Sequence, residues 1–201
     1  MGEATSPKER PILFSGAMVR AILADQKTQT RRIIRPEWLR CLDPADEEDM
    51  PNVLAGCPYG KPGDRLWVRE TWGGDDLNGY VYRADHEGAD LAAGELDDGE
   101  QEIRRWHPSI FMRRPASRIT LEVTGIRVQR LQDIAEDDIQ AEGVTRETAS
   151  AMCGKAIAQG TSPRLMWSMG WDAINGKRAA WASNPWVWVL SFRRAQEVSR
   201  G

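Results

Sequence analysis

The clearest alternation of apolar and polar positions runs from residue 117 to residue 128. Ile119, Leu121 and Val123 alternate there with polar residues, which is the period of a half-buried strand, and Gly125 is expected to bend it. Shorter runs of similar character predict further strands at 11–14, 65–72, 79–83 and 185–192. The last of these runs is nearly all apolar, so we expect it to be largely buried.

Helical periodicity is weaker and comes after short capping signals. Ser15 precedes an apolar run that we expect to form a helix to about Ala24, with residues 25–32 as its end and the following turn. A second helix is predicted at 136–142, closed by Gly143. Residues 144–176 are expected to be helical in part. Residues 41–63 contain several prolines and are interpreted as loop.

These elements predict an α+β fold, a small barrel-like domain with flanking helices. A chain of 201 residues with 41% hydrophobic content suffices for one domain with a proper core. We expect a flexible N-terminus at 1–10, a single domain at 11–194 and a C-terminal tail at 195–201. The acidic, glycine-rich segment at 85–102 has little to bury and is interpreted as a mobile insertion.

The charge balance argues against a protein that coats nucleic acid. The formal net charge is −3, and the sequence pI is about 5.5. Two segments are nevertheless basic, 27–40 and an arginine-rich stretch at 104–118. The second stretch contains Arg104, Arg105, Arg113, Arg114 and Arg118. The two segments form either a local anion site, for which RNA is a possible partner, or two separate solvated surfaces.

Metal, cofactor and membrane chemistry have no sequence signal. Three widely spaced cysteines and two distant histidines form no zinc pattern, so we expect no metal and no cofactor. The N-terminus lacks the apolar core of a signal peptide, and no apolar run is long enough to span a bilayer. A cytoplasmic protein without membrane contact is the simplest expectation.

Nine tryptophans are unusual for this length. Indoles can stack flat ligands such as bases, but most of the nine are expected to fill the core. Trp72 and Glu70, at the end of the predicted strand 65–72, are candidate substrate-binding residues. The alternative for Glu70 is an exposed strand carboxylate, and the pattern favours neither.

The segment 25–32, DQKTQTRR, carries the strongest candidate chemistry. Lys27 and Thr30 face the same way if the helical turn persists. A threonine hydroxyl becomes a nucleophile when a base removes its proton. A lysine serves as that base when burial or nearby cations, here Arg31 and Arg32, lower its pKa. At this level the motif alone is weak evidence, because lysine and threonine at a helix end are usually solvated.

A second motif, further along the chain, strengthens the functional interpretation of the first. KTQTRR at 27–32 and KPGDRLWV at 61–68 together resemble the signature of ASCH domains, small β-barrels of the PUA-like superfamily. The resemblance extends through 117–128 and 131–143 to 185–192, and so covers most of residues 11–194. Two longer segments, CPYGKPGDRLWVRETW and NPWVWVLSF, are similar in sequence to ASCH proteins of prophages and bacteriophages. The resemblance implies a PUA-like β-barrel with flanking helices and a long insertion at about 73–116.

The resemblance also implies an activity. Small bacterial ASCH proteins of the YqfB type are amidohydrolases of N4-acetylcytidine and related N4-acylcytidines. Their functional residues match Thr30 as nucleophile, Lys27 as base and Glu142 as the group that assists proton transfer to the leaving amine. Arg32 matches the family arginine, and it or backbone amides would stabilise the oxyanion. The substrate implied is a cytidine-type nucleoside or base, with Arg31 and Arg32 among its binding residues.

One departure and two alternatives accompany this interpretation. Asp25 replaces the glycine usual two residues before the lysine; its carboxylate would either raise the pKa of Lys27 or face water. The same cleft could instead bind RNA or a modified nucleotide without turnover. A metal-independent ribonuclease is the third possibility, since such cleavage needs only an acid and a base.

Overall fold

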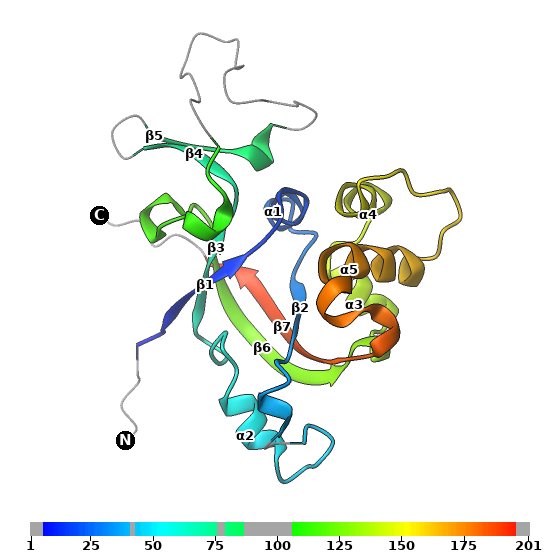
Figure 1. The fold of residues 1–201 in the computed structure, drawn as a ribbon. Helices are drawn as coiled ribbons and strands as arrows, with labels where there is room; N and C mark the ends of the chain where they lie inside the picture. The colour runs from blue at the N-terminus through cyan, green and yellow to red at the C-terminus, as the bar shows by residue number, and fades with distance from the viewer. Residues whose placement is uncertain (1–5, 41–42, 76–78, 87–105, 196–201) are drawn as a thin grey trace.

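The computed structural model describes residues 6–40, 43–75, 79–86 and 106–195 (Figure 1). Within these ranges the chain is α+β, with five α-helices and a mixed five-stranded sheet. The strands of this sheet are β1 (Glu9–Leu13), β2 (Gln29–Ile33), β3 (Arg65–Arg69), β6 (Thr120–Arg130) and β7 (Trp186–Arg194). A separate two-stranded sheet pairs β4 (Trp72–Asp75) with β5 (Gly79–Tyr82).

The large sheet has the order β1-β3-β6-β7-β2. β1 and β3 are parallel, and every other neighbouring pair is antiparallel. β1 and β2 are the two ends of this order and do not pair in the described residues, so the expected barrel is not closed there. The edge of β2 that faces away from β7 therefore has no strand partner in these ranges.

The long strand β6 and the final strand β7 form the centre of the sheet. Alternation along 117–128 predicted β6, and its pairing with β7 slips between Val123 and Gly125, where the sequence predicted a bend. β7 is largely buried, as its apolar sequence predicted. Trp188 and Leu190 belong to one core cluster, whereas Val187 and Val189 belong to the other. The two clusters therefore lie on opposite faces of the sheet.

The helices are α1 (Gly16–Leu23), α2 (Met50–Ala55), α3 (Glu136–Ala141), α4 (Arg146–Cys153) and α5 (Pro163–Ala179). Ser15 caps α1, as expected, by accepting a hydrogen bond from the backbone amide of Met18. Figure 1 shows α3, α4 and α5 gathered on the side of the sheet that carries β2. α3 contacts both β2 and α5, and α4 packs against α5 and α1. These elements enclose the candidate site.

Three boundaries differ from the sequence-based expectations. Residues 41–63 are not loop throughout, because α2 begins beside Pro51, and proline is well tolerated in a first helical turn. Strand β1 begins at Glu9, inside the expected flexible N-terminus. The strand expected at 65–72 ends at Arg69, and Trp72 begins the separate strand β4. Residues 87–105 of the expected insertion, and the tail from 196, fall outside the described residues.

Candidate active site

A tight turn after α1 places Lys27 inside the protein. The amides of Gln26 and Lys27 both donate to the carbonyl of Ala21, at 2.8 and 3.0 Å. Asp25 adopts a positive φ of 56° at this turn. The helix has ended at Leu23, so the expected helical face shared by Lys27 and Thr30 is wrong. Lys27 instead lies in the approach to β2.

The end of α3 meets this turn directly. Lys27 and Glu142 form an isolated antiparallel bridge, and the amide of Thr28 donates to the carbonyl of Ala141 at 2.8 Å. Gly143 follows with φ 71°, and a Cβ there would lie 2.9 Å from the Cβ of Lys27. Glycine is therefore needed for both the backbone conformation and the close approach.

The ammonium group of Lys27 is enclosed by acceptors. Nζ donates to the backbone carbonyls of Gln29 and Glu142 at 2.8 and 2.9 Å, and to Oε2 of Glu142 at 2.7 Å. The side chains of Lys27 and Glu142 are 1% and 6% exposed. A lysine ammonium has three donors, so this geometry uses all of them.

Burial lowers the pKa of Lys27 below its ordinary value. The Glu142 carboxylate opposes that shift, and the positive charges of Arg32 and Arg31 add to it. The net direction makes Lys27 easier to deprotonate than a surface lysine. A neutral lysine with an acidic partner at hydrogen-bonding distance can act as a general base.

Thr30 is buried in the middle of β2, 2% exposed. Its hydroxyl has no hydrogen-bond partner among the described residues, whereas the side chains of Gln29 and Arg31, on the other face of the strand, are bonded to α3 or to each other. Thr30 lines the same pocket as Lys27 and Glu142. The structure thus brings all three predicted catalytic residues to one cavity.

The free edge of β2 also directs a backbone amide outward. The carbonyl of Thr28 accepts from Phe192 on β7 at 2.9 Å, and Thr30 pairs with Leu190 two residues later. In an antiparallel ladder the bonding direction alternates, so the backbone of Gln29 and Arg31 faces away from β7. The carbonyl of Gln29 does so, since it accepts from Lys27. The amide of Arg31 therefore points to the open edge.

The pocket that these residues share is partly open to solvent. One side is polar and comes from β2 and the end of α3: Lys27, Thr30, Arg31, Arg32, Glu142 and Gly143. The other side is mainly apolar and comes from three helices and a loop: Met18, Val144, Thr148, Met152, Trp167, Gly170, Trp171, Ile174 and Asn175.

The two arginines differ in their surroundings. Arg31 is completely buried, and its guanidinium donates to Glu142 and to Asp138. Arg32 points to the other face, where Nη2 donates to the carbonyl of Leu13 at 2.6 Å and the guanidinium lies 5.0 Å from the ring centre of Phe14. Burial lowers the pKa of Arg32 from its ordinary value. It reaches the pocket without a carboxylate partner among the described residues.

Glu70 and Trp72 do not line this pocket. Glu70 is buried and receives two hydrogen bonds from Arg118, at 2.9 and 3.1 Å. Its burial raises its pKa, and Arg118 opposes that shift. Trp72 stacks on His107 with ring centres 4.7 Å apart. The two predicted binding residues therefore belong to the region around β4 and β5, and Glu70 is not an exposed carboxylate.

The arginine-rich segment is only partly described. Arg104 and Arg105 lie outside the described residues. Arg114 pairs with Glu9, and Arg118 pairs with Asp85 as well as Glu70. Two of the arginines considered for RNA binding thus form ion pairs with carboxylates.

Several residues of the site were not foreseen. Asp138 was not among the predicted site residues, but its carboxylate accepts from Arg31 at 2.6 Å and from Arg127 at 2.7 Å. Its position four residues before Glu142 was the available signal, because such residues share a helix face. The pocket walls from α4 and α5 had no comparable signal.

The described residues contain no group of three potential metal ligands among histidine, cysteine, aspartate and glutamate. No helix in the described part of the chain is long and apolar enough to cross a membrane.

Comparisons with known proteins give one structural likeness. No family profile matches the chain, and no curated protein does. Among solved structures, the chain is similar to an ASCH domain from Lactobacillus crispatus JV V101, at 10% sequence identity. The overlay covers 93% of this chain and 79% of that one, with a TM-score of 0.37.

Proposed function

We propose that this protein is an amidohydrolase that removes the acyl group from N4-acetylcytidine-like nucleosides or bases. The observation that carries the proposal is the buried Lys27–Glu142 pair in the same pocket as Thr30, whose hydroxyl has no partner among the described residues. The ASCH-like motif suggests the same three residues. A base, a nucleophile and a proton carrier are the groups that acyl transfer from an amine requires.

The first half of the reaction forms an ester on Thr30. Neutral Lys27 removes the hydroxyl proton, and Oγ1 attacks the acyl carbonyl carbon. The oxyanion is stabilised by the outward-facing amide of Arg31 and by the guanidinium of Arg32. When the tetrahedral intermediate collapses, the carbon–nitrogen bond breaks. The proton held by Lys27 passes through Glu142 to the leaving N4 amine, which departs as cytidine or cytosine.

The second half restores the enzyme. Water attacks the acyl-threonine ester, with Lys27 again accepting the proton. The ester bond breaks, Thr30 regains its hydroxyl hydrogen, and the carboxylic acid leaves. The apolar helical side of the pocket accommodates the remainder of the substrate.

The pocket favours a small substrate over long nucleic acid. Its catalytic groups are buried, and the net charge of the chain is −3. Two arginines of the proposed RNA-binding segment are paired with carboxylates. Two alternatives remain for the experiment below to distinguish. One is binding of RNA or a modified nucleotide without turnover, and the other is metal-independent cleavage of RNA.

The test is hydrolysis of N4-acetylcytidine by the wild type and by Lys27→Ala, Thr30→Ala and Glu142→Ala. We expect the wild type to release cytidine and acetate, and each variant to lose about a hundredfold or more in kcat/KM, because each removes a group that acts in the transition state. Product is followed by chromatography, and thermal unfolding shows whether each variant is folded.

Glu122→Gln serves as the matched control, because Glu122 pairs with Arg193 on the outer surface and does not line the pocket. It should retain wild-type kinetics. If the wild type releases no cytidine but binds RNA in a salt-dependent way, the binding module is correct and the amidohydrolase is not. Cleavage of RNA by the wild type would instead support the ribonuclease.

A further inference from the structure

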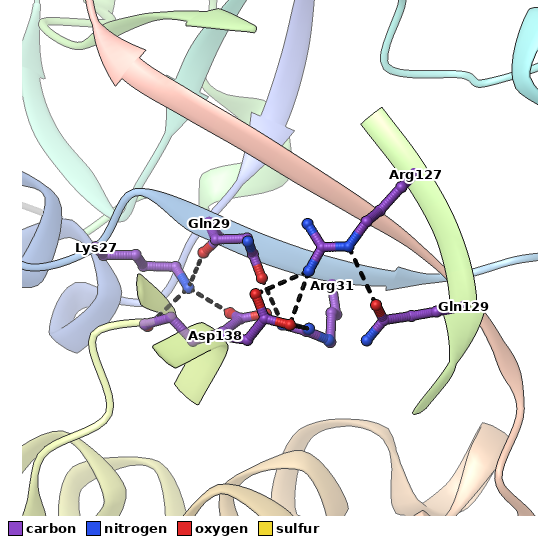
Figure 2. Close-up of polar contacts among 7 residues, drawn as sticks. Lys27, Gln29, Arg31, Arg127, Gln129 and Asp138 are labelled. Carbon is purple, nitrogen blue, oxygen red and sulfur yellow. Dashed lines mark hydrogen bonds and ion pairs between the residues drawn. The ribbon is translucent and has the colours of Figure 1, made fainter. Parts of the chain in front are cut away.

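A row of alternating charges connects the buried lysine to the protein surface. Figure 2 shows Lys27, Arg31, Asp138 and Arg127 along β2, α3 and β6, with dashed lines marking their polar contacts. Glu142 stands between Lys27 and Arg31 in this row. Neighbouring members carry opposite charges. The side chains of Lys27, Glu142 and Arg31 are 6% exposed or less, whereas that of Asp138 is 17% exposed and that of Arg127 is 44% exposed.

Arg31 joins the two carboxylates of α3. Nη1 donates to Oε1 of Glu142 at 3.1 Å, and Nη2 donates to Oδ2 of Asp138 at 2.6 Å. Nη1 also donates to Oε1 of Gln29 at 2.8 Å. Because Lys27 holds the other oxygen of Glu142, the carboxylate is fixed at both ends. Its orientation thus depends on where Arg31 is held.

Asp138 is in turn held from outside. Nη2 of Arg127 approaches its two carboxylate oxygens at 2.8 and 2.7 Å, and Nε of Arg127 donates to Gln129 at 3.1 Å. Burial alone would raise the pKa of Asp138, but the hydrogen bonds of Arg127 and the charge of Arg31 outweigh it and lower the pKa. Asp138 is therefore a fixed negative charge at ordinary pH.

We propose that Asp138 and Arg127 are positioning residues, which act through Arg31 to hold Glu142 on Lys27 and to set the pH at which the site becomes active. Neither residue lines the pocket, so neither would touch the substrate. The kinetic part of this inference rests on the proposed amidohydrolase function. The electrostatic part concerns Lys27 alone and can be measured without substrate.

The charged groups facing Lys27 are few. Glu142 at the end of α3 favours its ammonium form, and Arg31 and Arg32 on β2 oppose it. The other elements around the pocket contribute uncharged side chains: Met18 from α1, Thr148 and Met152 from α4, and Trp167, Trp171, Ile174 and Asn175 from α5. A change of charge in the row should therefore change the pKa of Lys27, because no other element around the pocket contributes a charge that would compensate for it.

Substitutions of Asp138 and of Arg127 should have opposite effects on the pKa of Lys27. Asp138→Asn removes a negative charge and keeps the side-chain shape, so the positive charge of Arg31 acts more strongly on Lys27. Lys27 should then lose its proton at lower pH, and the rising limb of the pH–rate profile should move down by about half a pH unit. Arg127→Gln removes a positive charge and should move that limb up by a similar amount.

The experiment measures the pH dependence of kcat/KM for N4-acetylcytidine in both variants and in Glu122→Gln. It also follows the 13Cε resonance of Lys27 against pH in the absence of substrate, with Lys27→Ala identifying the signal. Glu122→Gln makes the same change of net charge as Asp138→Asn, but on a partly exposed carboxylate that pairs only with Arg193 among the described residues. It should shift neither profile.

Opposite shifts of the Lys27 resonance would support the inference even if the wild type hydrolysed no acylcytidine, which would then count against the proposed function alone. Shifts of the same sign, no shift in either variant, or an equal shift in Glu122→Gln would overturn it. If Asp138→Asn does not fold, Arg127→Gln still decides the matter, because Arg127 is at the exposed end of the row.

Discussion

Two residues with positive φ make the contact between Lys27 and Glu142 possible. Asp25 has φ 56°, a conformation that glycine adopts easily and that aspartate tolerates better than most residues. Its carboxylate forms two hydrogen bonds of 2.9 Å to Arg194, and 70% of its side-chain surface is exposed. The Asp25 carboxylate was expected either to raise the pKa of Lys27 or to face water. The structure agrees with the second expectation, since the side chain faces away from the lysine.

Gly143 is the less replaceable of the two. We predict that Gly143→Ala lowers the free energy of unfolding by about 2–4 kcal/mol, because a Cβ adds strain at φ 71° and meets Lys27 and Ala21 at 2.9 and 3.1 Å. Urea unfolding measures the change. It should also lower the activity, since the Lys27–Glu142 contact must shift.

Gly154→Ala is the matched control for this prediction. Gly154 has φ 66°, but a Cβ there would meet nothing within 4 Å. We expect it to cost only the backbone strain, about 1 kcal/mol, and to leave the activity unchanged. Equal losses of stability in the two variants would show that the contact with Lys27 is not tight.

At the scale of elements, α5 gives the pocket its apolar side. No described residue of the expected insertion at 73–116 lines the pocket. Trp167 and Trp171 stack with ring centres 5.4 Å apart, and both are buried and line the pocket. Ile174, one turn further, is 49% exposed at the pocket.

Ile174 therefore offers a test of the α5 side that does not disturb the core. We predict that Ile174→Ala raises KM for N4-acetylcytidine about three- to fivefold with little change in kcat, because it removes apolar contact area distant from the reacting carbonyl. Steady-state kinetics measure both constants.

Leu165→Ala is the control, because Leu165 is 52% exposed on the same helix and does not line the pocket. It should leave KM unchanged. Equal effects of the two substitutions would mean that the substrate does not lie against α5.

For the molecule as a whole, local patterns predicted most strands and their order along the chain. The alternation at 119–123 predicted β6, and the apolar run at 185–192 predicted the buried β7. Pairing between distant strands has no local signal, so the sequence could not show that the sheet ends at β1 and β2 without closing in the described residues. The same limit applies to α2, whose proline was interpreted as a loop signal.

The residues of the candidate site could likewise be predicted only in part. Lys27, Thr30 and Glu142 were predicted through a motif resemblance, and the structure places them in one pocket. The expected local structure was wrong, because Lys27 lies in a turn and Thr30 in a strand, and the two do not share a helix face. Asp138 and Arg127 were missed as partners because their contact joins α3 to β6 across a register that only the fold establishes.

Cytidine release from N4-acetylcytidine, measured against pH for the wild type and Thr30→Val, tests the central claim most directly. Valine keeps the shape of threonine and removes only the hydroxyl. We predict that the wild type releases cytidine faster as pH rises and Lys27 loses its proton, at a pH below the ordinary lysine pKa. Thr30→Val should be about a hundredfold slower or worse, with an unchanged melting temperature. No release by the wild type, or equal rates in the two proteins, would contradict the proposed role of Thr30.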